Sequence, residues 1–413
     1  MKKRPSSPHG LRCISIGTLI IILLIFNIVS FSVHRVSASS RVSSATIGGC
    51  PLFPVNNIWN YDISQLPLAA NSANYVANIG LGGHLHPDFG SGLYNGAPIG
   101  FPYVVVPPSQ PSVSVSFQYA SESDPGPYPI PANAPIEGGS QSTGDRHVLV
   151  VESGTCKLYE TFASYPQPDG SWKAGSGAAW NLNSNALRPA TWTSADAAGL
   201  PILPGLVSYD EVASGVINHA LRFTVAQTQG TFLWPARHRA ASSQDSNSPP
   251  LGLRLRLKAS VNISSFSRTN QIILTALRHY GMFVADNGSS WFVSGTTDNR
   301  WNNSDLHALS SIPGSDFEAV NESSLEMNAN SGQVSGVLAP TPVISPTPLL
   351  TATLFPHVAN TPQSEMRTVY STTPNGSHSG LSGILLPIVG GIALLLGITG
   401  AMVLLKRRKR ARF

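Results

Sequence analysis

Charged residues are scarce in this chain, because Asp, Glu, Lys and Arg together make up only 11% of its 413 residues. The basic residues gather at the two ends, so the formal net charge of +5 says little about the middle. Residues 39–330 hold 14 Lys and Arg against 20 Asp and Glu, a net charge of −6. A mildly acidic domain offers no basic surface to a phosphate backbone, so we expect no nucleic-acid partner.

Several motifs of common enzyme classes are also missing. The sequence has no glycine-rich nucleotide loop, no HExxH zinc helix and no GxSxG nucleophile elbow, and we therefore predict no cofactor. The segment His84–Asp88 places two histidines and an aspartate on one face of an extended stretch, as metal ligands would be. Leu85 and Pro87 interrupt this pattern and no second histidine cluster completes it, so an ordinary polar loop is favoured over a metal site.

Two long apolar runs bracket the middle of the chain. The first, Cys13–Val33, follows basic residues and precedes the small residues Val36–Ala38, a pattern typical of a secretory signal. We therefore predict a signal peptide over residues 1–38, with an uncleaved signal anchor as the alternative. The second run, residues 384–405, is uncharged, long enough to cross a bilayer and followed by a basic tail over residues 406–413. It predicts a transmembrane helix whose tail is cytoplasmic.

Residues 327–382 between the folded part and this helix are rich in Pro, Ser and Thr and lack hydrophobic periodicity, which predicts a disordered stalk. The expected localisation is the cell membrane, with a single pass and an extracellular globular domain over residues 39–326. Leu386–Gly390 reads LPIVG and resembles a sortase signal of Gram-positive surface proteins, except that Val389 stands where such signals carry threonine. Covalent attachment to the cell wall therefore stays an alternative to a membrane anchor.

Cysteine is nearly absent, with three in the chain. Cys13 lies in the predicted signal, which leaves Cys50 and Cys156 as the pair in the exported part. Two thiols in an oxidising compartment favour a disulfide, and no CxxC spacing indicates a metal site. We predict that the Cys50–Cys156 bond joins the start of the domain to a strand.

Strand signals dominate the middle of the chain, where short β-branched or alternating segments stand between Gly, Pro and Asn clusters. They cover residues 103–106, 112–119, 147–152, 157–164, 219–225, 253–259 and 290–295. Helical periodicity is clearest over residues 270–280 and weaker over 72–79, 210–213 and 304–311. The expected fold is mainly β with a few peripheral helices, a sandwich or barrel-like single domain of mainly antiparallel strands, with a two-domain split near Pro189–Pro204 as the alternative. Asn287-Gly288 predicts a hairpin turn between two of the strands.

Acidic residues in loops are the first candidates for chemistry. Glu122, Asp124 and Glu137 belong to proline- and glycine-rich loops, where binding and catalytic groups concentrate on a β scaffold. Two carboxylates facing each other across a groove are what glycoside hydrolysis requires, so we assign these three to substrate binding. Solvated turn acids are the structural alternative.

Histidines at the heads of strands are the second group. Alternation puts His147 on one face of its strand with Leu149, and His219 on one face with Leu221. Such histidines are either satisfied core residues or groups that line a cleft, where they act as general acid or base. The candidate catalytic residues are Asp145, His147, Asp196, His219, Arg237 and His238.

Four long strings, TSADAAGLPILPGL, HALRFT, RLRLKAS and ALRHYGMFVADNGSSW, together resemble an uncharacterised family of secreted bacterial proteins. The resemblance covers Pro51 to about Val320. It implies one intact exported domain, which argues against the two-domain split, and it carries no assigned activity and no catalytic residues.

Two functions remain open at the level of sequence. The first is a membrane-anchored extracellular domain that binds or processes polysaccharide, with a glycan as partner, since acid-bearing loops and tryptophans are frequent. The second is a non-catalytic adhesion or scaffold module, in which the same motifs serve packing and turns. Convergence of the candidate carboxylates and histidines in one place would favour the enzyme.

Overall fold

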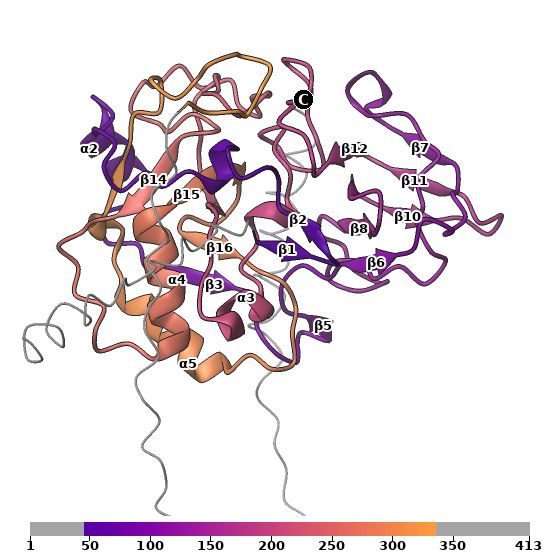
Figure 1. Ribbon diagram of the computed structural model, residues 1–413, viewed down its shortest axis with the longest axis horizontal. Helices are drawn as coiled ribbons and strands as arrows, with labels where there is room; N and C mark the ends of the chain where they lie inside the picture. The colour runs from indigo at the N-terminus through magenta and orange to yellow at the C-terminus, as the bar shows by residue number, and fades with distance from the viewer. Residues whose placement is uncertain (1–44, 336–413) are drawn as a thin grey trace, which may run out of the picture. The chain divides into compact units, whose positions relative to one another are not determined.

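A computed structural model describes residues 45–335 (Figure 1). The predicted signal peptide, the transmembrane helix, its basic tail and most of the stalk lie outside the described residues. Within residues 45–335, no helix combines the length and apolarity needed to cross a membrane.

The class expected from sequence is confirmed, since the described chain is mainly β with few helices (Figure 1). The largest sheet has six strands, in spatial order β17 (Phe317–Ala319), β14 (Arg254–Leu257), β15 (Met282–Asn287), β13 (Leu221–Val225), β16 (Phe292–Ser294) and β3 (His86–Asp88). A four-stranded sheet follows the order β12 (Ser176–Asn181), β9 (Lys157–Phe162), β8 (Val148–Glu152) and β6 (Val104–Val106). Each sheet ends in two edge strands, so neither closes into a barrel.

Smaller sheets complete the β structure. They are the three-stranded sheet β10 (Tyr165–Pro166), β11 (Trp172–Ala174) and β7 (Val115–Phe117), and the two-stranded pairs β1 (Thr46–Ile47) with β2 (Cys50–Pro51) and β4 (Leu93–Tyr94) with β5 (Ala97–Pro98). Most strand pairs are antiparallel, as expected, whereas β13–β15, β3–β16, β6–β8 and β7–β11 are parallel.

The helices lie close to the positions that the periodicity predicts. They are α2 (Ser72–Ile79), α3 (Tyr209–Ser214), α4 (Arg268–His279) and α5 (Asn303–His307), with 3-10 turns η1 (Ile58–Asn60), η2 (Ala120–Glu122), η3 (Leu203–Gly205), η4 (Ala308–Ser311) and η5 (Gly314–Asp316). In α4, the Ser267 hydroxyl caps the first turn by accepting the Asn270 N–H, and Ile273 and Leu277 are buried on the face that packs near β14. Gly281 follows with a φ of 65°, which ends the helix.

The strand β8 shows how sequence alternation shapes the core. Leu149 and Val151 face the main hydrophobic cluster, and Val148 and Val150 face a second, smaller cluster. The four-stranded sheet is therefore covered on both faces, which explains why β8 is apolar on both sides.

The hairpin predicted at Asn287-Gly288 is wrong. β15 and β16 do flank this turn, but β13 lies between them in the sheet, parallel to β15 and antiparallel to β16. The turn instead crosses the end of β13, where the Gly288 N–H donates to the Val225 carbonyl at 2.8 Å. A local turn signal cannot report a strand that arrives from sixty residues earlier in the chain, and here tertiary pairing overrides it.

The folded chain also continues past position 326, where we expected the stalk to begin. Val334 is buried, and its N–H donates to the Asn56 carbonyl at 3.0 Å. Asn330 accepts a hydrogen bond from Arg237 at 2.7 Å. A polar composition conceals these few anchoring contacts, so the compact part reaches at least Val334.

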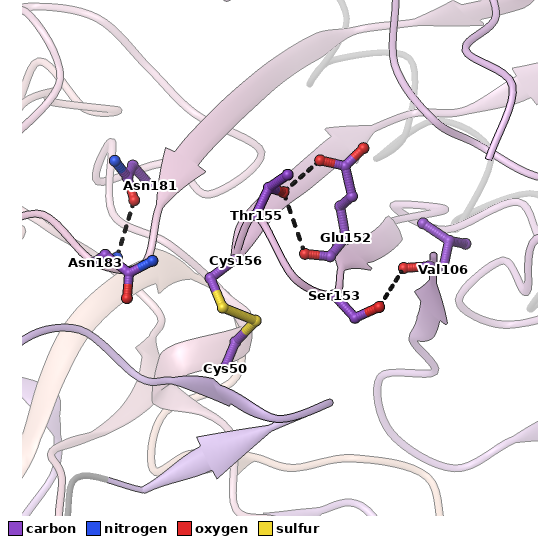
Figure 2. The surroundings of a disulfide bond; sticks show 8 residues. All are labelled: Cys50, Val106, Glu152, Ser153, Thr155, Cys156, Asn181 and Asn183. Atoms are coloured by element: carbon purple, nitrogen blue, oxygen red, sulfur yellow. Dashed lines mark hydrogen bonds between the residues drawn. A yellow bond between two sulfur atoms is a disulfide. The ribbon is translucent and has the colours of Figure 1, made fainter. Parts of the chain in front are cut away.

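The disulfide between Cys50 and Cys156 is confirmed (Figure 2). It joins β2 to the turn between β8 and β9, across a sequence separation of 106 residues. In this turn the Thr155 hydroxyl contacts the Glu152 carboxylate, and the Ser153 hydroxyl donates to the Val106 carbonyl at 3.0 Å. The bond therefore ties the N-terminal β1–β2 pair to the four-stranded sheet.

Replacing both cysteines by serine is expected to lower the free energy of unfolding by about 2–5 kcal/mol, because a loop of this length restricts the unfolded chain strongly. Urea unfolding of wild type and of the double variant, under non-reducing conditions, measures the difference. An unchanged unfolding midpoint would contradict this structural role.

Candidate functional site

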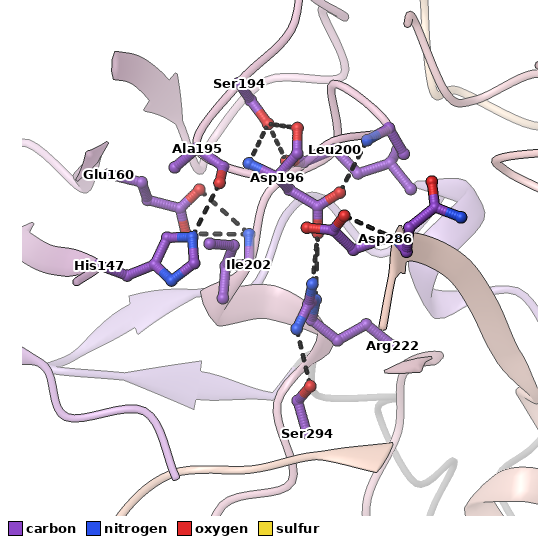
Figure 3. Close-up of polar contacts among 12 residues, drawn as sticks. His147, Glu160, Ser194, Ala195, Asp196, Leu200, Ile202, Arg222, Asp286 and Ser294 are labelled. Carbon is purple, nitrogen blue, oxygen red and sulfur yellow. Dashed lines mark hydrogen bonds and ion pairs between the residues drawn. The ribbon is translucent and has the colours of Figure 1, made fainter. Parts of the chain in front are cut away.

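A buried ion pair between Arg222 and Asp196 forms the centre of the candidate site (Figure 3). Arg222 lies on β13, and its Nη2 and Nε donate to Asp196 Oδ2 at 2.8 and 3.1 Å. Its Nη1 donates to the Ser294 hydroxyl of β16 at 2.7 Å. Both charged side chains are almost fully buried. Burial of a charge is costly unless it is paired and hydrogen-bonded, and this arrangement satisfies both conditions.

The turn that carries Asp196 is built by its own sequence. The Ser194 hydroxyl accepts the Asp196 N–H at 2.9 Å and donates to the Leu200 carbonyl at 2.6 Å. Asp196 Oδ1 accepts the Ala198 N–H at 2.9 Å. Gly199 has a φ of 68°, and a Cβ there would lie 2.6 Å from a backbone oxygen, so only glycine fits. Contacts within the turn itself therefore hold the Asp196 side chain in place, in addition to its ion pair with Arg222.

Glu160 on β9 holds the far end of the same segment. Its buried carboxylate accepts the Ile202 N–H at 3.0 Å (Figure 3). It also accepts the Leu203 N–H at 2.8 Å and the indole N–H of Trp180 at 2.9 Å. Burial raises the pKa of Glu160, although these donors oppose the shift. The segment from Ser194 to Leu203 is therefore anchored at both ends.

Asp286 lies beside this ion pair, at the end of β15. Figure 3 shows its carboxyl group next to that of Asp196, above the Arg222 guanidinium. Burial and the neighbouring Asp196 carboxylate raise the pKa of Asp286 to about 7. Because Asp196 is held by Arg222 and Asp286 is not, the proton that these two carboxyl groups share belongs on Asp286.

His147 and Glu137 lie on another side of Arg222. His147 Nδ1 is 2.6 Å from Glu137 Oε2, and Nε2 is 2.9 Å from the Ala195 carbonyl oxygen. Both ring nitrogens face acceptors, so both carry protons and the ring is an imidazolium. Burial opposes this charge, but Glu137 outweighs it and raises the pKa of His147 to about 9. Glu137 is desolvated as well, yet the charge of His147 lowers its pKa, so Glu137 is ionised at neutral pH.

Phe101 lies between these two charged pairs. The Arg222 guanidinium is 5.4 Å from the centre of its ring, and the His147 ring is 5.4 Å from it on centroids. A phenyl face attracts cations and separates two like charges without needing a polar partner. The ring therefore keeps Arg222 and His147 in one region despite their charges.

Asp88 completes the group on β3. It is aligned with Ser294 in the parallel pair of β3 and β16, so the two side chains share a face of the six-stranded sheet. Desolvation and the charge of Glu137 raise the pKa of Asp88, whereas Arg222 lowers it. Asp88 thus lies close enough to Glu137 and Arg222 for their charges to shift its pKa.

Solvent reaches three of the four carboxyl groups. Asp88 is exposed, Asp286 is half-buried, and the Glu137 side chain is 24% exposed, whereas Asp196 is 1% exposed. Protein atoms surround Asp88 and Asp286 closely enough to raise their pKa, although both retain contact with water. Arg222 and Asp196 are therefore buried, and three carboxyl groups beside them keep contact with solvent.

The structure brings together three of the nine candidates from sequence, namely His147, Asp196 and Glu137. Asp145 stands at the margin of this group, since it is exposed but its charge contributes to the raised pKa of His147. His219 is fully buried elsewhere, with Nε2 3.0 Å from Glu211 Oε1 and Nδ1 donating to the Ala220 carbonyl at 2.8 Å. It is a satisfied core histidine, the structural alternative considered from sequence.

The side chains of Glu122, His238 and Asp124 make contacts around the segment that carries Asp196. Glu122 accepts the Thr193 N–H at 3.2 Å and lies 3.8 Å from His238 Nε2. His238 Nδ1 is 2.9 Å from the Ala197 carbonyl. Asp124 pairs with Arg188 and accepts the Ala179 N–H at 2.9 Å.

Arg237 is likewise committed to backbone contacts. Its Nε donates to the Arg188 carbonyl at 2.7 Å, and its Nη1 donates to the Ala329 carbonyl. Sequence reasoning thus assigned to chemistry four residues, Glu122, Asp124, Arg237 and His238, whose visible contacts are structural.

Sequence reasoning missed Arg222, Asp286 and Asp88 as members of the site. Asp286 was assigned to a turn, and Asp88 to a polar loop. The usable signal for Arg222 is that an arginine in a strand of buried residues needs a carboxylate partner, and Asp196, already a candidate from sequence, is an acid in the neighbouring segment. Among residues 45–335, no group of three His, Cys, Asp or Glu is arranged to hold a metal ion.

No family model, curated protein or solved structure matches the chain. The resemblance to secreted bacterial proteins therefore stays a prediction, and the roles of the site residues depend on their geometry alone.

Removing one member of the central ion pair, by Asp196→Asn or Arg222→Met, is expected to lower the free energy of unfolding by about 3–5 kcal/mol, because the other charge stays buried without its partner. The double variant is expected to lose less than the sum of the two losses, as measured by urea unfolding in a double-mutant cycle. Additive losses would show that the two residues do not act as a pair.

The imidazolium of His147 predicts a pH-dependent stability. Its folded pKa of about 9 lies above the unfolded value of 6.5, so the stabilisation is complete below pH 6.5 and is lost as the pH rises through 9. We expect His147 to lower the free energy of unfolding by about 2 kcal/mol between pH 7 and 9, whereas Asp286, whose pKa is about 7, releases about half a proton in this range and contributes only about 0.4 kcal/mol. His147→Gln should flatten this slope, and the exposed His84→Gln should keep it. An equal slope in all three proteins would exclude His147 as its source.

Proposed function

We propose that this domain hydrolyses glycosidic bonds of an extracellular polysaccharide, with Asp286 as general acid and Glu137 as general base. The observation that carries the proposal is the convergence of Asp286 and Glu137, 149 positions apart in the sequence, on the buried Arg222. Both carboxyl groups keep contact with water. Sites at which titratable groups with displaced pKa values converge are typical of acid–base catalysis.

The two carboxyl groups have the protonation states that this reaction requires. Glycoside hydrolysis needs one protonated carboxyl to donate to the leaving oxygen and one ionised carboxylate to act on water. The raised pKa of Asp286, about 7, keeps it largely protonated below neutral pH, and the lowered pKa of Glu137 keeps it ionised. The difference comes from their partners: Asp286 faces a carboxylate, whereas Glu137 faces an imidazolium.

In the proposed reaction, the Asp286 proton moves to the glycosidic oxygen while the bond from that oxygen to the anomeric carbon breaks. A water molecule attacks the anomeric carbon and gives one proton to Glu137. Asp286 is then an anion beside Arg222, whose charge stabilises it. Proton exchange with solvent restores both groups, which completes the balance of the reaction.

His147 and Asp196 are positioning residues in this proposal. His147 donates both of its N–H groups, so neither ring nitrogen is free to take a proton from a substrate. It fixes the Glu137 carboxylate instead. Asp196 holds Arg222 and, by its charge, keeps Asp286 protonated.

The extracellular substrate follows from the predicted topology. The signal peptide, stalk and membrane helix expected from sequence would hold the domain outside the cell, where a polysaccharide is accessible. An adhesion module with the same anchor is the second class considered, and it requires no protonated carboxyl beside a buried arginine.

Asp286→Asn is expected to reduce reducing-end release from the cleaved polysaccharide by about 10²–10⁴-fold, because an amide cannot donate the proton. Wild-type turnover should fall as the pH rises through about 7, since Asp286 must be protonated to act. The assay uses the purified full chain against a panel of soluble polysaccharides, with rates measured from pH 5 to 9.

Asp169→Asn is the matched control, because Asp169 is an exposed turn acid whose side chain, within residues 45–335, bonds only Ser171. It should keep wild-type turnover at every pH. Glycan binding without turnover by the wild-type chain would reject the hydrolase and favour the adhesion module.

A further inference from the structure

An aromatic pair stands on the same sheet face as Asp88. The imidazole of His86 stacks on the ring of Phe292, with centroids 4.0 Å apart and an angle of 29° between the planes. His86 is exposed and Phe292 is half-buried. β3 is the edge strand of the six-stranded sheet, so no further strand covers His86 on its outer side.

Strand register places this pair relative to the acid–base groups. His86 is aligned with Phe292, Phe292 with Thr224, and Thr224 with Asp286, which makes one row across β3, β16, β13 and β15. At the usual spacing of neighbouring strands, His86 and Asp286 are about 14 Å apart along this row. Asp88, two residues beyond His86, is about 7 Å from it along the strand.

The exposed imidazole has no polar role within residues 45–335. Its ring nitrogens make no hydrogen bond there, and the neighbouring titratable groups are Asp88 and His307. His86 takes no part in the core on the other face, where Trp291 stacks on Phe223 and Phe317. A flat aromatic surface held rigidly at a sheet edge is suited to a ligand with a flat apolar face.

We propose that His86 and Phe292 form a stacking subsite for a pyranose ring of the substrate, several sugars away from the bond that is cleaved. The inference rests on the proposed function and defines its substrate as a polymer. Asp286 lies two strand spacings from Phe292 and three from His86, about 10 and 14 Å, so only a chain of several sugars reaches from His86 to Asp286. Pyranoses whose hydroxyl groups are all equatorial present the flat C–H face that such stacking requires.

The charges of the site narrow the substrate class further. The two cations are buried and already paired, Arg222 with Asp196 and His147 with Glu137. The groups that meet solvent are carboxyl groups, among them Asp88 beside the stacking pair. A uronic acid would find no free cation in this group and would be repelled, so the substrate is a neutral or amino-sugar polymer.

The experiment uses three β-1,4-linked hexamers with the same backbone, namely cellohexaose, its 2-amino counterpart and its 6-carboxy counterpart, together with cellobiose. Binding to the full chain is measured by calorimetry, and cleavage by release of reducing ends. His86→Gln and Phe292→Ala are expected to weaken binding of the neutral and amino hexamers about tenfold and to raise KM with kcat unchanged. Cellobiose should be affected by neither variant.

His86→Tyr is the conservative variant, because it keeps a ring without an imidazole, and it should retain wild-type affinity. Tyr165→Ala is the matched control, since Tyr165 is a similarly exposed ring in the three-stranded sheet. Equal hexamer affinity in wild type and His86→Gln, or preference for the carboxy hexamer, would overturn the subsite and leave the hydrolase standing. Binding as expected without cleavage would overturn the hydrolase only, and no binding to the wild-type chain would overturn both.

Discussion

The ion pair between Arg222 and Asp196 is the constraint on which the rest of the site depends. It brings a charged side chain from the middle strand of a buried sheet against a turn that begins some thirty residues earlier. Such a pair contributes little net stability compared with an apolar contact, but it permits only one arrangement of turn and sheet. Asp286, Glu137 and Asp88 lie close enough to Arg222 for its charge to lower their pKa.

Buried ion pairs also occur elsewhere in the fold, where each cation has a single carboxylate partner. His219 with Glu211 and Arg254 with Glu322 are also desolvated cations that each face one carboxylate. Around Arg222 the acids outnumber the cations, because Asp88 and Asp286 join the two ion pairs already there. Burial and the neighbouring Asp196 carboxylate raise the pKa of Asp286 to about 7, so a proton is retained there near neutral pH. Burial raises the pKa of Glu322 beside Arg254 to about 7 as well, so the surplus of carboxyl groups around Arg222, and not a raised pKa by itself, distinguishes this region.

Much of the fold could be predicted from local pattern. Alternation defined both faces of β8, helical periodicity located α4, and two isolated cysteines indicated the disulfide. The site was only partly accessible, since His147, Asp196 and Glu137 were identified but not their relation. The decisive contacts are non-local: Arg222 meets Asp196 through the turn, and Asp286 joins them because β13 separates β15 from β16. No spacing in the sequence encodes that insertion.

That insertion has a consequence for how the domain is made. β13 is synthesised well before the two strands that enclose it, and its neighbours close around it from both sides. Until β15 and β16 pair with β13, Arg222 is not enclosed by the sheet, and the carboxyl groups are not held close to it. The site is therefore a product of completed long-range pairing, which is slow compared with local structure formation. A chain in which β15 and β16 have not closed around β13 lacks the grouping of carboxyl groups around Arg222, so that grouping reports the completed pairing of these three strands.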